Sequence, residues 1–148
     1  MGSIGMIRYA TRSDVDRAVE LIKESHASAG FEFPFVEGYA RALFFRHVGN
    51  ADAACILLEL RGVVQGILMV TYGEHPFGAG RIARETLWYI APKGRGGSAF
   101  KMLSMYEEWA KMHKCAMVSM ASLVSNDVSA IYERLNYKPM EIHFTKAL

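Results

Sequence analysis

One stretch of the sequence, residues 82–113, limits most strongly what this chain can fold into. Ile82–Ala91 is rich in residues typical of strands, and Pro92 closes it. A glycine-rich loop follows, and from Ala99 to His113 apolar side chains recur at helical spacing. A strand, a short loop and a helix in direct succession predict an α/β protein in which the helix packs back onto the sheet.

The remaining segments predict a single domain over residues 1–148, because no repeat or linker-like tract interrupts the pattern. Met1–Ser3 could derive from a cloning vector, as could other residues within 1–5, with Met6 as the native start. Two strand-like runs flank Arg61-Gly62, which predicts a tight hairpin. The predicted order is β-α-α-β-β-β-α-β-α-β, a mixed α/β sheet with helices packed against it. Strands are expected at Ile4–Ala10, Ala54–Leu60, Val63–Tyr72, Ile82–Ala91, Cys115–Leu123 and Met140–Lys146, and helices at residues 14–26, 36–47, 99–113 and 126–135.

Composition excludes several classes of protein. Seventeen Lys and Arg against fifteen Asp and Glu give a net charge of +2, so no polybasic nucleic-acid or membrane binder is expected. With 51% hydrophobic residues, wholesale disorder is excluded, and no apolar run has the roughly 18 residues of a membrane span. Cys55 and Cys115 are too few for a disulfide scaffold, and the histidines are scattered, so we expect a cytoplasmic protein without a metal site.

The loop between the strand and the helix is a candidate anion site. Its sequence is Arg95-Gly96-Gly97-Ser98-Ala99. A helix N-terminus presents unpaired N–H groups and a partial positive charge, and glycines let a diphosphate approach them closely. A plain strand-to-helix turn with three glycines would explain the same residues, so the loop alone leaves both interpretations open.

Two motifs together resemble the GCN5-related N-acetyltransferase (GNAT) superfamily, in its small single-domain bacterial or phage type. Arg95–Phe100 lines up with the coenzyme A loop of that family, Gln/Arg-x-x-Gly-x-Gly/Ala. Asn126–Tyr137 is similar to its Asn-x-x-(Ser/Ala)-…-Tyr-x-x-x-Gly-Phe segment, and Ile7–Thr11 fits its opening strand. Ser98 and Phe100 depart from the usual small residues, so Phe100 has to point away from the diphosphate. Asn136 replaces a glycine, at little cost because Asn tolerates the left-handed conformation.

The resemblance implies a fold, a cofactor and a set of binding residues. The fold is a mostly antiparallel, splayed sheet with helices on both faces, and the cofactor is acetyl-CoA. Strand backbone would pair with the pantetheine arm if the sheet splays, and one of its N–H groups could also hold an oxyanion. Asn126 could bond the pantetheine amide, although capping of the last helix would also explain it. The expected cofactor-binding residues are Trp88, Tyr89, Ile90, Arg95, Gly96, Gly97, Ser98, Ala99, Phe100 and Asn126.

Acetyl transfer to an amine needs a base and a donor to the leaving sulfur. A lysine-like amine is almost wholly protonated at pH 7. Glu85 is the base candidate, because it lies ten residues before Arg95, similar to the strand glutamate of the family. A solvated acid at a strand end is an equal alternative for this residue. Glu74 and His75 are weaker candidates for the base. Tyr132 is the general-acid candidate by its motif position, and its place on an apolar helix face would also suit a core residue.

The acceptor is the least defined part. Phe31, Phe33 and Phe35 lie between the first two helices, where the family builds its acceptor wall, and an exposed aromatic cluster could equally be a homodimer contact. The sequence therefore predicts an acetyl-CoA-dependent N-acetyltransferase, an acyltransferase that passes acetyl directly to a primary amine of a small molecule or peptide. The alternative is a non-catalytic acyl-CoA sensor or interaction module of the same fold.

Overall fold

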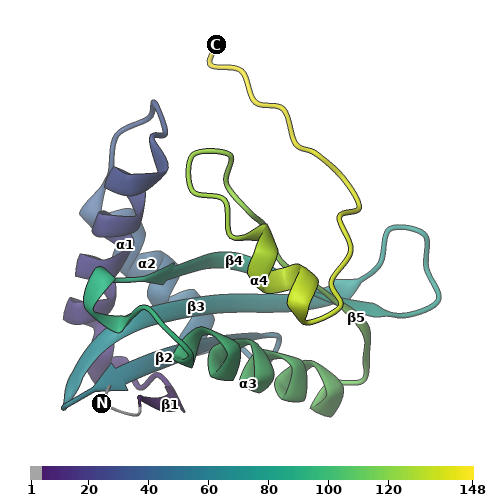
Figure 1. Ribbon diagram of the computed structural model, residues 1–148, viewed down its shortest axis with the longest axis horizontal. Coiled ribbons are helices and arrows are strands. Elements are labelled where there is room, and N and C mark those ends of the chain that lie inside the picture. The colour runs from purple at the N-terminus through teal and green to yellow at the C-terminus, as the bar shows by residue number, and fades with distance from the viewer. Residues whose placement is uncertain (1–4) are drawn as a thin grey trace.

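The computed structural model describes residues 5–148 as one five-stranded sheet with helices on both faces (Figure 1). The elements are β1 (Met6–Tyr9), α1 (Val15–Ala29), α2 (Glu37–Val48), β2 (Ala53–Leu60), β3 (Val63–Glu74), β4 (Arg81–Ile90), α3 (Ser98–Met112), β5 (Cys115–Ser119) and α4 (Ser129–Arg134), with short 3-10 turns at Arg12–Asp14 and Pro92–Gly94. The predicted order is confirmed from β1 to α4. Ile4, predicted as a strand residue, and Met1–Ser3 lie outside the described residues.

The strands follow one another across the sheet in the order β1-β2-β3-β4-β5. Neighbours are antiparallel except β4 and β5, which run parallel. Arg61 and Gly62, with φ of 51° and 79°, join β2 to β3. Two consecutive left-handed residues make the hairpin turn whose twist matches that of the strands, so the predicted tight hairpin is confirmed.

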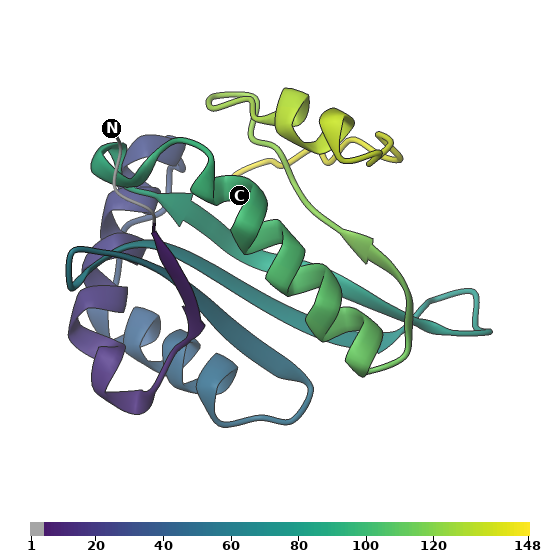
Figure 2. The same cartoon turned by 60° about the horizontal axis from the view of Figure 1, so that its bottom comes forward.

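Each face of the sheet has its own hydrophobic core. On one face α1 and α2 contribute Leu21 and Phe44, which pack with Leu57 of β2. On the other face α3 contributes Tyr106, which packs with Ile56. Adjacent residues of β2 thus belong to opposite cores, as strand alternation requires. The rotated view makes the separation visible, with α3 lying along one face and α1 and α2 beyond the other (Figure 2).

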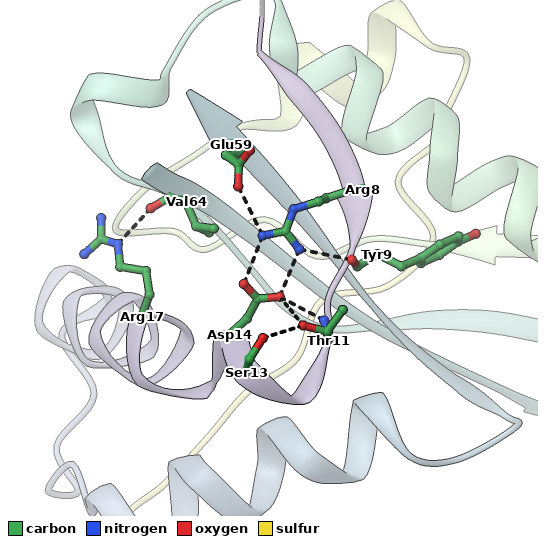
Figure 3. Close-up of polar contacts among 8 residues, drawn as sticks. All are labelled: Arg8, Tyr9, Thr11, Ser13, Asp14, Arg17, Glu59 and Val64. Carbon is green, nitrogen blue, oxygen red and sulfur yellow. Dashed lines mark hydrogen bonds and ion pairs between the residues drawn. The ribbon is translucent and has the colours of Figure 1, made fainter. Parts of the chain in front are cut away.

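A charged cluster ties β1 to the start of α1 (Figure 3). The guanidinium of Arg8 donates to both carboxylate oxygens of Asp14 at 2.9 Å and to Glu59 of β2 at 3.2 Å. The backbone N–H of Thr11 also donates to Asp14, at 2.8 Å. These hydrogen bonds hold the pKa of Asp14 below its usual range, with the bond from Arg8 as the main cause. The cluster therefore fixes β1 on the edge of the sheet.

The predicted last strand is wrong for this chain. No residue after α4 belongs to a strand, and Met140, Ile142 and Phe144 are 88%, 79% and 90% exposed. The segment leaves the body of the molecule instead of returning to the sheet (Figure 1). Alternation along a sequence predicts an extended conformation, but it cannot say whether the chain's own sheet offers a partner.

Two further expectations need correction. The strand expected over Cys115–Leu123 ends at Ser119, and its residues are half-buried or exposed because it is the last strand of the sheet. Asn126 does not cap α4, which begins at Ser129. A tight turn, in which the N–H of Asn126 bonds the carbonyl of Leu123, holds Asn126 away from the helix. Asp127 accepts the backbone N–H of Ser129 at 2.9 Å in its place.

Within residues 5–148 there is no helix of the length and apolarity that crossing a bilayer requires.

Candidate functional site

Strands β4 and β5 separate part-way along their length, which leaves one edge of β4 open. They pair only where Arg81–Arg84 lies beside Cys115–Ser119. From Glu85 to Ile90, β4 pairs on its β3 side alone, within the part of the chain that the structure describes. After β5 the chain rises away from the sheet towards α4 (Figure 2). The backbone of Trp88, Tyr89 and Ile90 therefore faces the splay that a strand-like ligand would need.

A β-bulge lies where the open edge begins. Val70 of β3 faces Glu85 and Met69 faces Leu87, so Thr86 is an extra residue without a cross-strand partner. The Thr86 hydroxyl lies 2.7 Å from Nε2 of the buried His47, whose Nδ1 lies 2.8 Å from the Leu43 carbonyl. A carbonyl only accepts, so Nδ1 carries the hydrogen and Nε2 accepts from Thr86. Burial also lowers the pKa of His47. This neutral histidine holds the bulge in place.

Glu85 is a half-buried carboxylate beside the splay. Its Oε1 accepts the backbone N–H of Ala121 at 3.0 Å. Burial raises the pKa of Glu85 to about 7, and the Ala121 hydrogen bond acts in the opposite sense. A carboxylate with a pKa near neutrality can both accept and release a proton at physiological pH, as a general base must.

Tyr132 of α4 bonds the same residue, Ala121, from its other backbone group. Its hydroxyl donates to the Ala121 carbonyl at 2.6 Å, and the residue is buried. Burial, followed by the proximity of Glu85, raises the pKa of Tyr132. The two predicted catalytic residues are thus brought together, with Ala121 between them. Sequence reasoning missed Ala121, and no signal could have found it, because only its backbone takes part.

The glycine loop presents three open donors. Among residues 5–148, the N–H groups of Gly96, Gly97 and Ser98 have no hydrogen-bond partner, whereas those of Ala99 and Phe100 bond back to the carbonyls of Gly96 and Gly97. Both glycines are exposed, and a Cβ on either would meet no atom within 4 Å. Within the predicted loop Arg95–Phe100, the open N–H groups are therefore those of residues 96–98.

Arg95 and Phe100 flank these open donors. The Nε of Arg95 donates to the Ile90 carbonyl at 3.0 Å, which ties the loop to the end of β4. The ring of Phe100 lies against the guanidinium of Arg134, whose central carbon is 5.1 Å from the ring centroid. Arg134 thus adds an exposed cation beside the first turn of α3. Sequence reasoning missed it because an arginine on a short helix is indistinguishable from an ordinary surface residue.

The side chain of Trp88 adds an unsatisfied donor. Trp88 packs on the α3 face, and its ring centroid lies 6.0 Å from that of Tyr132. Its indole Nε1 is buried and has no hydrogen-bond partner among the residues described. Buried donors are nearly always satisfied, so an orphaned N–H next to an open strand edge fits a site that receives an acceptor group from a ligand.

The other predicted residues are more dispersed. Phe31 and Phe33 stack with centroids 5.3 Å apart, and His26 lies 6.1 Å from the ring of Phe35. A hydrogen bond from the Ser125 hydroxyl to the Ala29 carbonyl, 3.0 Å, holds this aromatic loop beside the loop that follows β5. Asn126 is exposed in that loop, and its side chain makes no hydrogen bond with residues 5–148. Glu74 and His75 lie where β3 and β4 join, away from the splay.

No protein-family model and no curated protein matches this chain. Solved structures match over almost its full length. A predicted acetyltransferase from Clostridium acetobutylicum, with acetyl-CoA, matches with a TM-score of 0.80 at 16% identity, over 97% of this chain and 96% of that one. A ribosomal-protein-alanine N-acetyltransferase from Brucella melitensis matches with a TM-score of 0.79 at 14% identity, over 97% of this chain and 99% of that one. An aminoglycoside N-acetyltransferase in complex with CoA matches with a TM-score of 0.81 at 13% identity, over 100% of this chain and 97% of that one.

The chain has the GNAT fold. The expected fold class, a mixed and splayed sheet with helices on both faces, is therefore confirmed. The features described above lie one after another along β4 and the loop that follows it. Glu85 lies at the bulge, the open edge runs from Glu85 to Ile90, and the loop with three free donors comes directly after it.

Proposed function

We propose that the protein is an acetyl-CoA-dependent N-acetyltransferase that passes an acetyl group directly to a primary amine of a small molecule or peptide. The main support is the open edge of β4, which runs from the half-buried Glu85 to the free donors of residues 96–98. Two neighbours of the same fold, solved with acetyl-CoA and with CoA, support the choice of cofactor.

Each part of the cofactor has a matching group on the protein. The N–H groups of Gly96, Gly97 and Ser98, at the N-terminus of α3, would hold the diphosphate, and Arg134 adds positive charge. From the loop back to Glu85 the open edge spans roughly 17 Å, at about 3.3 Å per residue. The pantetheine arm contains two amides, so it can pair with this backbone as an added strand would.

Glu85 is the proposed base. Acetyl-CoA supplies the acetyl group as an activated thioester. A carboxylate whose pKa is about 7 takes the proton from the acceptor ammonium, directly or through one water, and leaves a neutral amine that can attack. The open N–H groups of β4 around Trp88 can bind the negative charge that develops on the thioester oxygen.

Tyr132 is proposed to donate a hydrogen bond to the departing sulfur. In the free protein its hydroxyl hydrogen points to the Ala121 carbonyl, so it must rotate about the C–O bond to reach the sulfur. Because burial raises its pKa, complete proton transfer to a thiolate is uphill. A hydrogen bond that stabilises the sulfur anion, rather than full transfer, is the role that suits this phenol. As the C–S bond breaks, the attacking nitrogen gives up its second proton, which protonates the thiolate, and CoA leaves as the thiol.

The acceptor is proposed to bind between the aromatic loop and the loop after β5. Phe31 and Phe33 expose stacked rings there, and the Ser125–Ala29 hydrogen bond keeps the two loops together. Such a wall suits an amine with an apolar body. The neighbours include enzymes named for a ribosomal-protein alanine and for aminoglycosides, so both peptides and small molecules belong among the acceptors to test.

One observation favours a second function. The Tyr132 hydroxyl already donates a short hydrogen bond, 2.6 Å, to the Ala121 carbonyl. That bond has to break before the hydroxyl can donate to the sulfur. A non-catalytic acyl-CoA-binding module would keep that bond permanently. Both functions predict binding of the cofactor, and only the enzyme releases thiol from it.

A thiol-release assay tests the proposal. Acetyl-CoA is incubated with the protein and a panel of polyamines, aminoglycosides, amino acids and peptides, and free CoA is measured. We expect release that depends on one acceptor class, which mass spectrometry then identifies as acetylated. Binding of acetyl-CoA without release from any acceptor would favour the non-catalytic module.

Gly97 provides a matched pair of binding variants. Gly97→Glu places a negative charge beside the free N–H groups, and we expect the affinity for CoA to fall by more than about 10-fold. Gly97→Ala is the control, because a Cβ there meets no atom within 4 Å and the backbone φ of −61° is ordinary. If Gly97→Glu bound CoA as tightly as the native protein, measured by calorimetry, the proposed diphosphate site would be contradicted.

A further inference from the structure

His47 is buried, although the chemistry described so far makes no use of it. It is 3% exposed, and among residues 5–148 no other histidine and no charged side chain is buried. A buried polar group costs free energy unless hydrogen bonds satisfy it. Both ring nitrogens of His47 have partners, the Leu43 carbonyl at 2.8 Å and the Thr86 hydroxyl at 2.7 Å. The imidazole is therefore held in one orientation.

The imidazole of His47 connects α2 to β4. Leu43 lies one turn before His47 on the same helix, so the hydrogen bond between them fixes the direction of the ring. The helix itself is fixed in the core by Ala40 and Phe44, which are 3% and 0% exposed. Thr86, by contrast, lies 39 residues further along the chain and is exposed. A firmly packed helix thus holds an exposed residue of β4.

The bulge in β4 needs a restraint of this kind. A bulge is defined by the residue that is left out of the cross-strand pairing, and a strand that slips by one residue pairs differently along its whole length. Arg81–Arg84 is paired on both sides, with β3 and with β5, whereas among residues 5–148 the stretch from Leu87 to Ile90 pairs with β3 alone. This second stretch is the less restrained against slipping. The hydrogen bond to His47 fixes Thr86 as the residue left out.

A slip of the stretch from Leu87 to Ile90 would disturb the candidate site. The ring of Trp88 packs beside that of Tyr132, with centroids 6.0 Å apart, and the open N–H groups around Trp88 are the proposed donors to the thioester oxygen. Glu85 lies before the bulge, where β4 is better held. A slip would therefore move the donors and the indole relative to Glu85 and Tyr132.

We propose that His47 is a positioning residue for the acetyl transfer: it accepts the hydrogen bond of Thr86, fixes the bulge, and so keeps the open N–H groups around Trp88 aligned with Glu85. Both nitrogens of the buried ring are already bonded, so His47 acts only through Thr86. This role rests on the proposed function, because the alignment matters for catalysis only if Glu85 and these N–H groups act on the same thioester. A histidine that only filled space in the core would leave β4 unchanged when the Thr86 hydroxyl is removed.

Two substitutions of Thr86 form a matched pair. Thr86→Val keeps the shape and loses the hydroxyl, whereas Thr86→Ser keeps the hydroxyl, and both variants should fold because Thr86 is exposed. We expect Thr86→Val to lower kcat in the thiol-release assay about 10- to 100-fold while the affinity for CoA changes less than about 3-fold, since a misplacement of about 1 Å is enough to slow a reaction. Thr86→Ser should retain the native kcat. Equal kcat in the native protein and both variants would overturn the proposal.

A double-mutant cycle separates the role of His47 from a direct role of Thr86. A Thr86 hydroxyl that touched the acceptor would also lower kcat when it is removed. His47→Leu removes the accepting nitrogen and should lower kcat as Thr86→Val does, and the two substitutions together should be no slower than Thr86→Val alone. His47→Gln, whose amide oxygen can accept from Thr86, should recover part of kcat. Losses that simply add in the double variant would overturn the proposal.

Nuclear magnetic resonance tests the alignment without cofactor or turnover. Because the rings of Trp88 and Tyr132 lie close together, the free native protein should show a nuclear Overhauser effect between them. Thr86→Val should lose this signal and Thr86→Ser should keep it. A signal that is absent from the native protein, or equal in all three proteins, would overturn the proposal whether or not the protein releases thiol. If the signal were lost only in Thr86→Val and the native protein released no thiol, the hold of His47 on the bulge would be supported and the proposed function alone would be contradicted.

Discussion

The substitution Glu85→Gln should stabilise the protein, and by an amount that grows with pH. Burial raises the pKa of Glu85 from its ordinary 4.5 to about 7, so the folded state holds this proton more tightly than the unfolded state does. The stability of the native protein consequently falls as the pH rises from about 4.5 through about 7, and stays level above that. Glutamine does not titrate, and its amide oxygen can still accept the Ala121 N–H.

The size of the effect follows from the pKa difference. Each tenfold change in proton affinity corresponds to about 1.4 kcal/mol, so the raised pKa of Glu85 lowers the stability by about 3 kcal/mol at pH 8 and by about 1 kcal/mol at pH 5, relative to a side chain that does not titrate. For a chain of this length, a difference of about 2 kcal/mol corresponds to roughly 4 to 8 °C in the unfolding midpoint. The variant should thus unfold at a higher temperature than the native protein, with a gap that is wider at pH 8 by this amount.

Thermal unfolding monitored by circular dichroism at pH 5 and pH 8 measures the gap. Glu108→Gln is the control, since its side chain is 68% exposed and a surface change should alter stability by less than about 0.5 kcal/mol at both pH values. If the gap for Glu85→Gln were the same at pH 5 and pH 8, Glu85 would not have the raised pKa that the proposed mechanism needs.

Three further substitutions test separate parts of the structure. Tyr132→Phe should lower kcat about 10- to 1000-fold in the thiol-release assay while acetyl-CoA still binds, and unchanged turnover would remove Tyr132 from the mechanism. Trp88→Phe removes the orphaned indole donor and should weaken CoA binding about 3- to 10-fold by calorimetry; an unaltered affinity would mean that the indole N–H does not meet the ligand. Asp14→Asn should destabilise the protein by about 1 to 2 kcal/mol at pH 7, with the loss fading below pH 4, because the Asp14 carboxylate contributes stability only while it is ionised. The exposed Asp16→Asn serves as its control in urea titrations, and an equal loss in both variants would contradict the importance of the Arg8 cluster.

The order of the elements was predictable because each signal is local. Alternating and helical periods, the Arg61-Gly62 turn and the glycine loop after Pro92 are set by residues close in sequence. Except for the alternation over Met140–Lys146, which forms no strand, they correspond to observed elements. The resemblance to the GNAT superfamily supplied the splay between β4 and β5, which no local pattern contains.

What sequence could not supply is the geometry between distant segments. The bulge at Thr86 depends on how β3 and β4 align, and the link between Glu85 and Tyr132 passes through the backbone of Ala121. Asn126 has the side chain of a good helix cap, yet a tight turn with Leu123 removes it from the helix. In each case a competing contact from elsewhere in the chain decides the outcome.

The extra residue at Thr86 divides β4 into two halves of opposite phase. In an uninterrupted strand Glu85 and Trp88, three positions apart, would point to opposite faces of the sheet. Here both face the helix layer formed by α3 and α4. Deleting Thr86 would restore regular alternation of side chains along β4. Glu85 and Trp88 would then point to opposite faces of the sheet, although neither side chain had been changed.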